Sequence, residues 1–257
     1  MAETPLFHLD FRPNALSARY AILPGDPGRV PAIAARLEQV RTVGSNREYV
    51  CCEGLLNGHP VAVCSTGIGG PSAAIAAEEL HMAGVDTFIR VGTCGGMNLS
   101  VCAGDLVIAA SATRNEGVTY QYAPAAFPAA ADFAVTRALD DAAARLGYVR
   151  HVGTVHCKDS FYGQHSPERM PIAAALAAEW QAYLALGVLA SEMESAALYT
   201  VAASLGCRAG CVLSALWNQE RERAGLEQKS TLQPDTIGAD RAIETAIAAV
   251  ERLINNE

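Results

Sequence analysis

Short apolar runs alternate with alanine-rich amphipathic segments along the whole chain, and this rhythm limits the fold more than any other feature. We expect strands in five of the apolar runs, at 19–23, 60–64, 88–91, 106–110 and 209–215. We expect helices in five of the amphipathic segments, at 30–40, 72–82, 132–146, 193–205 and 239–253. Strands that alternate with helices are typical of a parallel or mixed sheet covered by helices. We therefore predict an α/β fold.

A single domain accounts for the length of the chain. No repeat, linker or low-complexity stretch divides its 257 residues, and α/β enzymes of this size are commonly single domains. We predict one domain over residues 1–257. Two prolines, Pro167 and Pro171, interrupt the segment 163–190, which we leave without an assigned element.

Charge and cysteine content exclude several classes of protein. A net charge of -8 argues against nucleic acid or an anionic membrane as the main partner. No apolar segment approaches the ~18 residues of a membrane span, and no basic and apolar leader opens the chain, so we expect a cytoplasmic protein. The 8 cysteines form no CxxC pair, which favours buried, reduced thiols over disulfides or a zinc site.

Three glycine-rich segments follow predicted strands, at 23–29, 65–71 and 90–96. Glycines let several backbone N–H groups converge on one anion. A tight turn would explain any one of these segments alone. Because there are three, and because two of them carry Arg29 and Arg90, we favour a phosphate site. None matches the P-loop pattern, and none has the spacing of a dinucleotide-binding fingerprint.

Six motifs in order resemble the uridine phosphorylases of the nucleoside phosphorylase I superfamily. They are PGDPGRV at 24–30, SNREY at 45–49, CSTGIGGPS at 64–72, RVGTCGG at 90–96, DSFYGQ at 159–164 and SEMESAAL at 191–198. The resemblance implies a single α/β domain around a central mixed, barrel-like sheet flanked by helices. It also implies a homo-oligomer, built from dimers and typically a hexamer, with active sites shared between two subunits.

By this resemblance, inorganic phosphate is a co-substrate held by Gly25, Arg29, Arg90 and Thr93, with Arg47 reaching in from the neighbouring subunit. The chemistry of the residues agrees, because a guanidinium is always charged and binds phosphate oxygens in a bidentate manner. Arg90 also interrupts an apolar run just before a glycine turn, which is unusual for a surface charge. We expect no organic cofactor.

The resemblance assigns the ribose to three residues. Glu194 would bind the 2′- and 3′-hydroxyls, Met193 would pack on the sugar, and His8 would bind the 5′-hydroxyl of the adjacent subunit's ribose. Glu192 and Glu194 lie two residues apart on a predicted helix, which rotates them by about 200°. We therefore expect them to face different ways and not to act as the paired acid and base of a glycosidase.

The base pocket matches the family less completely. Phe161 would stack on uracil and Gln164 would read its O2 and N3 edge. The best-known members carry an arginine two residues after this glutamine, where Ser166 stands here. Arg169 would substitute if its loop folds back. A second arginine of the family is replaced by Gln219.

The favoured reaction is reversible: uridine and phosphate give uracil and ribose 1-phosphate. Arg90, Arg29, Thr93 and Gln164 would carry it by positioning and electrostatics, without a protein nucleophile. A purine or broad-specificity phosphorylase is the nearest alternative, although Trp217 stands where the purine enzymes carry an aspartate. A nucleosidase that uses water and a non-catalytic nucleoside-binding relative also remain open.

The resemblance further implies a potassium ion at a dimer interface. Its ligands would be Glu48, Ile68 and Ser72, which supply a carboxylate, a backbone carbonyl and a hydroxyl. Hard cations take such oxygen ligands.

Overall fold

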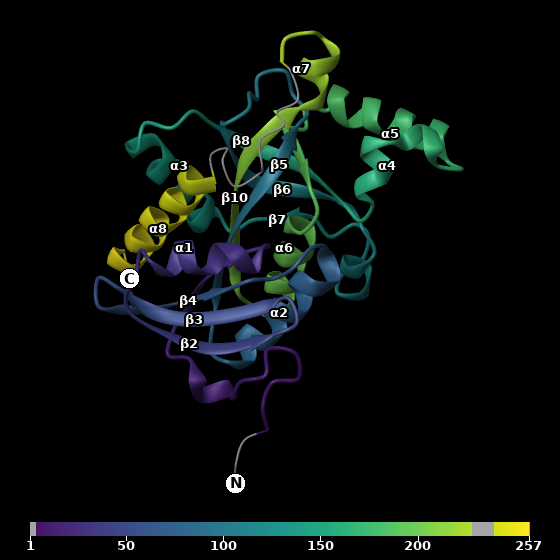
Figure 1. The fold of residues 1–257 in the computed structure, drawn as a ribbon. Coiled ribbons are helices and arrows are strands. Elements are labelled where there is room, and N and C mark those ends of the chain that lie inside the picture. The colour runs from purple at the N-terminus through teal and green to yellow at the C-terminus, as the bar shows by residue number, and fades with distance from the viewer. Residues whose placement is uncertain (1–3, 228–238, 257) are drawn as a thin grey trace.

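The computed structural model describes residues 4–227 and 239–256, whose strands form one ten-stranded mixed sheet. The order is β10-β6-β8-β9-β5-β1-β4-β3-β2, with β7 beside β6. Because β10 also pairs with β5, the five strands from β10 to β5 close into a barrel, and β1, β4, β3 and β2 extend from it (Figure 1). The strands are β1 Tyr20–Pro24, β2 Glu38–Asn46, β3 Tyr49–Leu56, β4 His59–Cys64, β5 Thr87–Gly96, β6 Leu106–Asn115, β7 Ala129–Ala130, β8 Arg150–Lys158, β9 Ala190–Glu192 and β10 Arg208–Asn218.

Helices cover both faces of the sheet. Helices α1, α3 and α8 pack on one face, α2 and α6 on the other, and α4, α5 and α7 lie beyond one end of the barrel (Figure 1). The helices are α1 Val30–Ala34, α2 Gly70–Met82, α3 Phe133–Arg145, α4 Phe161–His165, α5 Ala173–Ala185, α6 Ser195–Ser204, α7 Gln219–Arg223 and α8 Ala239–Asn255. None of the helices in the described ranges is long and apolar enough to span a membrane.

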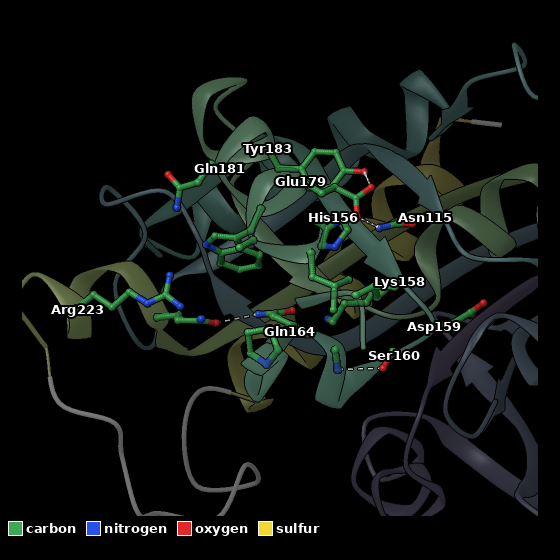
Figure 2. Close-up of a pocket in the computed structure, with 17 residues that line it drawn as sticks. Asn115, His156, Lys158, Asp159, Ser160, Gln164, Glu179, Gln181, Tyr183 and Arg223 are labelled. Atoms are coloured by element: carbon green, nitrogen blue, oxygen red, sulfur yellow. Dashed lines mark hydrogen bonds between the residues drawn. The ribbon is translucent and has the colours of Figure 1, made fainter. Parts of the chain in front are cut away.

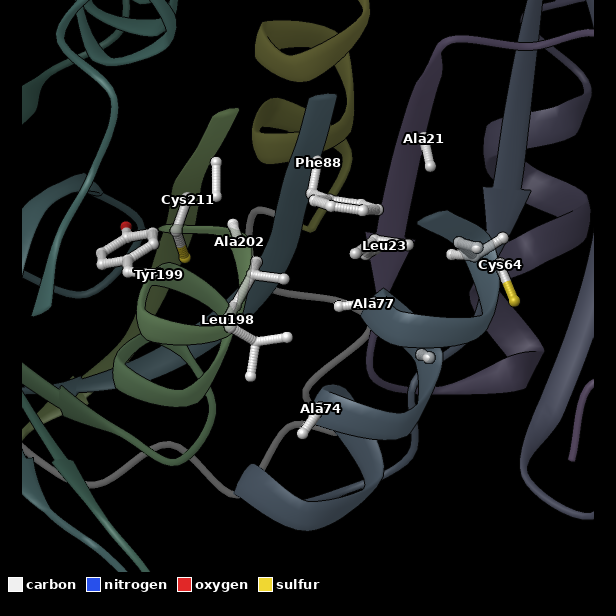
Figure 3. Packing of buried hydrophobic residues seen from close by; sticks show 14 of the residues in the cluster. Ala21, Leu23, Cys64, Ala74, Ala77, Phe88, Leu198, Tyr199, Ala202 and Cys211 are labelled. Atoms are coloured by element: carbon white, nitrogen blue, oxygen red, sulfur yellow. The ribbon is translucent and has the colours of Figure 1, made fainter. Parts of the chain in front are cut away.

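The central strands are mainly apolar because both of their faces are buried. Successive side chains of a strand point to opposite faces, so Phe88 joins the cluster under α2 and α6 while its neighbour Ile89 joins the cluster under α3 and α8. Figure 3 shows Phe88 and Leu198 in the first cluster. This double burial explains why the central strands are continuous apolar runs rather than alternating ones.

The predicted α/β class and the barrel-like sheet are confirmed, and all five predicted strands are present. Four of the five predicted helices are also present. The helix predicted at 30–40 is wrong in its second half, since α1 ends at Ala34 and β2 begins at Glu38. This strand lies at the edge of the sheet and is mostly exposed, so it lacks the apolar pattern that marked the others. The helix predicted at 193–205 begins at Ser195, because Ser191 and Glu192 belong to β9.

Strand β10 carries a β-bulge between Ala215 and Trp217. Beyond the bulge, Trp217 pairs with Gly95, and Asn218 pairs with Gly96. A Cβ on Gly96 would lie 2.7 Å from the Asn218 side-chain nitrogen, so the absence of a side chain there makes room for this asparagine.

All eight cysteines are free, as the sequence predicted. Six of them are buried in the sheet and its helices, and burial raises the pKa of thiols such as Cys94 and Cys211. A buried thiol with a raised pKa is a poor nucleophile. These six cysteines therefore act as small apolar residues in the core.

Candidate active site

The three glycine-rich segments meet at the ends of β1, β4 and β5. The backbone N–H of Thr66 donates to the carbonyl of Pro24 at 2.9 Å, and that of Gly67 donates to Gly25 at 2.9 Å. A Cβ on Gly25 would lie 3.1 Å from the Gly67 carbonyl and 3.7 Å from Nη1 of Arg90. A larger residue at Gly25 would therefore crowd the space in front of the guanidinium.

Arg90 is the only buried arginine of the described residues, with 5% of its surface exposed. Its Nε donates to Oε2 of Glu192 at 3.3 Å, and its Nη2 donates to the carboxylate of Glu194. Nη1 is buried and has no hydrogen-bond partner within residues 4–227 and 239–256. Because an unsatisfied buried donor is costly, this nitrogen on the Gly25 side is prepared for an anionic ligand.

The expectation that Glu192 and Glu194 face different ways is wrong. Both carboxylates reach Arg90, because Glu192 ends strand β9 and Glu194 is the residue before helix α6. The 200° rotation of a helix therefore does not apply to them. Glu192 accepts hydrogen bonds from the backbone N–H groups of Glu194 and Ser195, while Oε1 of Glu194 accepts from the N–H of Gly69 at 2.6 Å.

The surroundings of the two carboxylates shift their pKa values in opposite directions. Burial raises the pKa of Glu194, and the charge of Arg90 offsets this only in part. For Glu192 burial acts in the same direction, but Arg90 and the hydrogen bonds from Ser195 and Glu194 outweigh it, so its pKa is lowered. Glu192 is therefore the stable counter-ion of Arg90. Glu194 is the carboxylate with the higher proton affinity.

Arg29 and Thr93 follow Gly25 and Arg90 closely along the chain. Arg29 ends a short 3-10 helix, Pro27–Arg29, and is half-buried. The Asp26 side chain caps that turn by accepting from the N–H of Gly28 at 2.8 Å. Thr93 is half-buried in β5, in register with Ser214 of β10. The structure thus places Gly25 against the Arg90 guanidinium, and Arg29 and Thr93 lie on the segments that carry these two residues.

Arg47 and His8, which the resemblance assigns to a neighbouring subunit's site, lie beside each other. Arg47 is exposed in the two-residue turn between β2 and β3, with a left-handed φ of 53°. The adjacent Asn46 side chain donates to the backbone carbonyl of His8 at 2.8 Å. The His8 ring is held by Glu79, whose Oε1 lies 2.7 Å from Nδ1. One edge of the molecule therefore presents both side chains.

The oxygen groups proposed for a cation also gather at one point. Ser72 Oγ lies 3.0 Å from the carbonyl oxygen of Ile68. A Cβ on Gly67 would lie 3.3 Å from Ser72 Oγ and 2.7 Å from Cγ of Glu48. Ile68 itself is 79% exposed, so this cluster opens to the outside of the chain.

Phe161, His165 and Trp217 form a row of aromatic rings. The ring of Phe161 is 4.2 Å from that of His165, which in turn is 5.8 Å from the ring of Trp217. Phe161 is half exposed and offers a face to a ligand. Trp217 therefore takes part in this row of rings and is not only a core residue.

Gln164 is buried and is bound on both sides of its amide. Ser191 Oγ donates to its Oε1 at 2.6 Å, and its Nε2 donates to Oε1 of Gln219 at 3.3 Å. Arg169 is exposed, and its guanidinium lies over the ring of Tyr162, 5.9 Å from the centroid. The structure therefore places Gln219, rather than Arg169, against the Gln164 amide.

A cavity of about 360 Å³ opens behind Gln164, between β8 and α5 (Figure 2). Gln164, Gln219 and Lys158 border it on the side of the site, and Trp180 and Tyr183 border it from α5. Sequence reasoning missed Lys158 and Ser191, and it interpreted Gln219 only as a lost arginine. A lysine at the end of an apolar strand, directly before the DSFYGQ motif, was the one signal available for Lys158.

Known proteins resemble this chain over nearly its full length. The family model described as the phosphorylase superfamily matches residues 19–255. A uridine phosphorylase of Treponema pallidum is 48% identical, over 98% of this chain and 95% of the relative. A uridine phosphorylase of Thermococcus kodakarensis is 43% identical, over 90% and 85% of the two chains. A guanosine phosphorylase of Halorubrum lacusprofundi is 39% identical, over 75% of each.

The buried His156 makes the stability of the protein depend on pH. Burial, and then the charge of Lys158, lower its pKa to about 4. The unfolded chain takes up the proton near its usual pKa of about 6.5, so acid favours unfolding between those values. We expect His156 to cost on the order of 2–3 kcal/mol as pH falls from ~6.5 to ~4. Urea unfolding of the wild type and His156→Phe across this range should show a shallower loss in the variant. Equal losses would refute the prediction.

Proposed function

The chain belongs to the phosphorylase superfamily, and we propose that it catalyses the reversible phosphorolysis of uridine to uracil and ribose 1-phosphate. It would thus act as a pentosyltransferase of pyrimidine nucleoside catabolism and salvage. The observation that carries the proposal is the buried Arg90, held by two glutamates with one nitrogen left over beside Gly25. The names of the two uridine phosphorylase relatives support the choice of base.

Phosphate would bind where Arg90, Arg29, Thr93 and the backbone at Gly25 meet. A buried guanidinium attracts an oxyanion more strongly than an exposed one, because little water screens the charge. Burial opposes the charge of Arg90, but Glu194 and Glu192 raise its pKa above the usual value. Arg90 therefore stays charged when phosphate is absent, and no reorganisation is needed when phosphate arrives.

The ribose would lie between phosphate and base. Glu194 accepts hydrogen bonds and is held by Gly69 and Arg90, so it offers a fixed acceptor to the 2′- and 3′-hydroxyls. The half-buried Met193 supplies the apolar contact to the sugar. Loosening of the bond to the base gives a sugar with oxocarbenium character, which the negative phosphate stabilises and then captures at the anomeric carbon. No protein nucleophile takes part.

The base would stack on Phe161 and be read by Gln164, which also stabilises the departing uracil anion. One observation favours uracil over a purine. Strand β10 contains no acid that would protonate a purine nitrogen, since RAGCVLSALWN ends in Trp217 and Asn218. The similarity to a guanosine phosphorylase keeps a purine or broad-specificity phosphorylase as the second candidate.

The active enzyme would be a homo-oligomer built from dimers, a hexamer in its full form. Arg47 and His8 share one exposed edge, and Arg47 has a left-handed backbone that an arginine adopts at a cost of ~1 kcal/mol. The two-residue hairpin turn requires this backbone, and it holds Arg47 at the tip of the hairpin, from which it would reach a partner's phosphate site. We place the enzyme in the cytoplasm, because its eight free thiols suit a reducing compartment.

A potassium ion would bind at the same dimer edge. The Ile68 carbonyl, the Ser72 hydroxyl and the Glu48 carboxylate all adjoin Gly67, and these donors are the oxygen types that hard cations prefer. Three ligands from each of two subunits would complete the coordination of one ion. The ion would fix the edge that carries Arg47.

One assay tests the reaction class. The protein is incubated with uridine, inosine or 5′-methylthioadenosine, each with and without phosphate. We expect uridine cleavage that requires phosphate and yields ribose 1-phosphate. Cleavage of uridine at the same rate without phosphate would show a hydrolase, preferred cleavage of inosine would show the purine alternative, and no cleavage would show a binding protein.

Mixed oligomers test the shared site. Arg29→Ala and Arg47→Ala should each lose at least ~10-fold in activity, because each removes a charged phosphate ligand. In a mixed dimer one site carries both substitutions and the other carries neither, so mixing should restore roughly a quarter of the wild-type activity. A mixture of Arg29→Ala and Thr93→Ala is the control, because both residues belong to the same subunit's site. No recovery in the first mixture would exclude sharing.

Potassium should stabilise the protein. We expect a higher melting temperature in KCl than in choline chloride of equal ionic strength, because a ligand that binds only the folded state stabilises it. Glu48→Gln should reduce this difference. Glu38→Gln, an exposed glutamate of the same hairpin, should retain it. Equal melting temperatures in the two salts would exclude the site.

A further inference from the structure

Four buried side chains form one continuous hydrogen-bonded chain at the base side of the site. Lys158 Nζ donates to Ser191 Oγ at 2.5 Å, Ser191 Oγ donates to Gln164 Oε1 at 2.6 Å, and Gln164 Nε2 donates to Gln219 Oε1 at 3.3 Å. Each of the four is at most 8% exposed. They come from β8, β9, α4 and α7, so only the folded protein brings them together. Figure 2 shows Lys158 and Gln164 on the wall of the cavity.

We propose that Lys158 and Ser191 are positioning residues that hold the Gln164 amide in one of its two orientations, and thereby make the site prefer uridine over cytidine. The inference rests on the proposed function, in which Gln164 reads the base. It assigns a role to two residues that need not touch the substrate.

The direction of the chain follows from which groups can donate. A lysine ammonium has three hydrogens and no acceptor, whereas a serine hydroxyl has one hydrogen and can also accept. Because Lys158 donates to Ser191, the single hydrogen of Ser191 is left for its other neighbour. Gln164 Oε1 is the acceptor that this hydrogen reaches, so the oxygen of the Gln164 amide faces Ser191 and the nitrogen faces Gln219.

The opposite orientation of the amide would be penalised at both ends. With the amide turned over, the nitrogen of Gln164 would face the hydrogen of Ser191, and its oxygen would face Oε1 of Gln219. The hydrogen of Ser191 would then lose its acceptor, and two acceptors would meet at Gln219 unless that amide turned over as well, in a buried place where each unsatisfied polar group costs about 1–3 kcal/mol. Lys158 contributes to this polarity, because it fills an acceptor site of Ser191 and leaves the hydroxyl hydrogen for Gln164.

The charge of Lys158 is supported within the same cluster. Burial lowers the pKa of Lys158, while the carboxylates of Glu192 and Glu194 oppose that shift. Glu192 is the counter-ion that also binds Arg90. Glu192, which binds Arg90, thus also helps to keep the Lys158 side chain charged.

A fixed amide can distinguish uracil from cytosine. One lone pair on Oε1 and one hydrogen on Nε2 remain for the base once Ser191 and Gln219 are bound. Uracil presents an N3–H donor beside a carbonyl acceptor, which matches this pair. Cytosine presents an N3 acceptor beside an amino donor on one edge, which matches only the turned amide. Its other edge presents two acceptors, so one bond is lost.

The test compares kcat/KM for uridine and cytidine at saturating phosphate in Lys158→Met and Ser191→Ala. Both variants release the amide, so we expect the uridine-to-cytidine ratio to fall by about 10-fold or more. The KM for phosphate should stay within about twofold, because Arg90 and its glutamates are retained. Ser191→Thr keeps the hydroxyl and should restore the ratio.

Thr200→Val is the matched control. Thr200 is a buried hydroxyl residue of α6 whose Oγ1 has no hydrogen-bond partner among the residues that the structure describes, so its loss should leave the ratio unchanged. A merely structural role of Ser191 would lower the activity toward both nucleosides equally. That result, or a wild type without preference for uridine, would overturn the inference.

The outcomes also separate this inference from the proposed function. A wild type that fails to cleave uridine with phosphate overturns the function itself. A wild type that cleaves uridine, with a ratio that Ser191→Ala leaves unchanged, overturns only the orientation of Gln164. If Lys158→Met does not fold, Ser191→Ala decides alone, because it removes a single oxygen from the buried chain.

Discussion

The buried ion cluster of Arg90 with Glu192 and Glu194 is the interaction on which the site depends. A guanidinium inside a sheet loses its hydration, a penalty of several kcal/mol that only close counter-charges offset. The two glutamates supply them from the segment between β9 and α6, and Glu194 also binds the N–H of Gly69 at the start of α2. One arginine therefore joins β5, β9 and two helices. The same three side chains therefore stabilise the fold and make the proposed phosphate and ribose contacts.

Much of the fold could be predicted from the sequence because the central strands are buried on both faces and read as apolar runs. The importance of Arg90 was visible for the same reason, since a cation inside such a run needs a partner. The exposed edge strand β2 has no such signal, and its sequence predicts the end of a helix instead. The sequence does not predict helix α5, because two prolines precede it and its apolar residues show no clear period.

The local sequence could not show how the side chains of the site meet. Glu192 and Glu194 share Arg90 because Glu192 ends a strand and Glu194 precedes a helix. The rotation expected between two residues of one helix therefore does not apply to them. The two side chains that bind the Gln164 amide lie 27 and 55 positions away from it in the sequence. Motif resemblance pointed to Gln164 itself. It could not reveal Ser191, Lys158 and Gln219, because their contacts arise only when β8, β9, α4 and α7 come together.

The bulge in β10 determines which way the side chains at the end of this strand point. If the strand continued without it, Leu216 would stand opposite Gly95 and Trp217 opposite Gly96, where a glycine now leaves room for an asparagine. Asn218 would then no longer cap α7, where its side-chain oxygen accepts hydrogen bonds from the first backbone N–H groups of the helix. The extra residue in the bulge therefore reverses the alternation of the strand. From the bulge to Gln219, each side chain points to the opposite face from the one that it would have without the bulge.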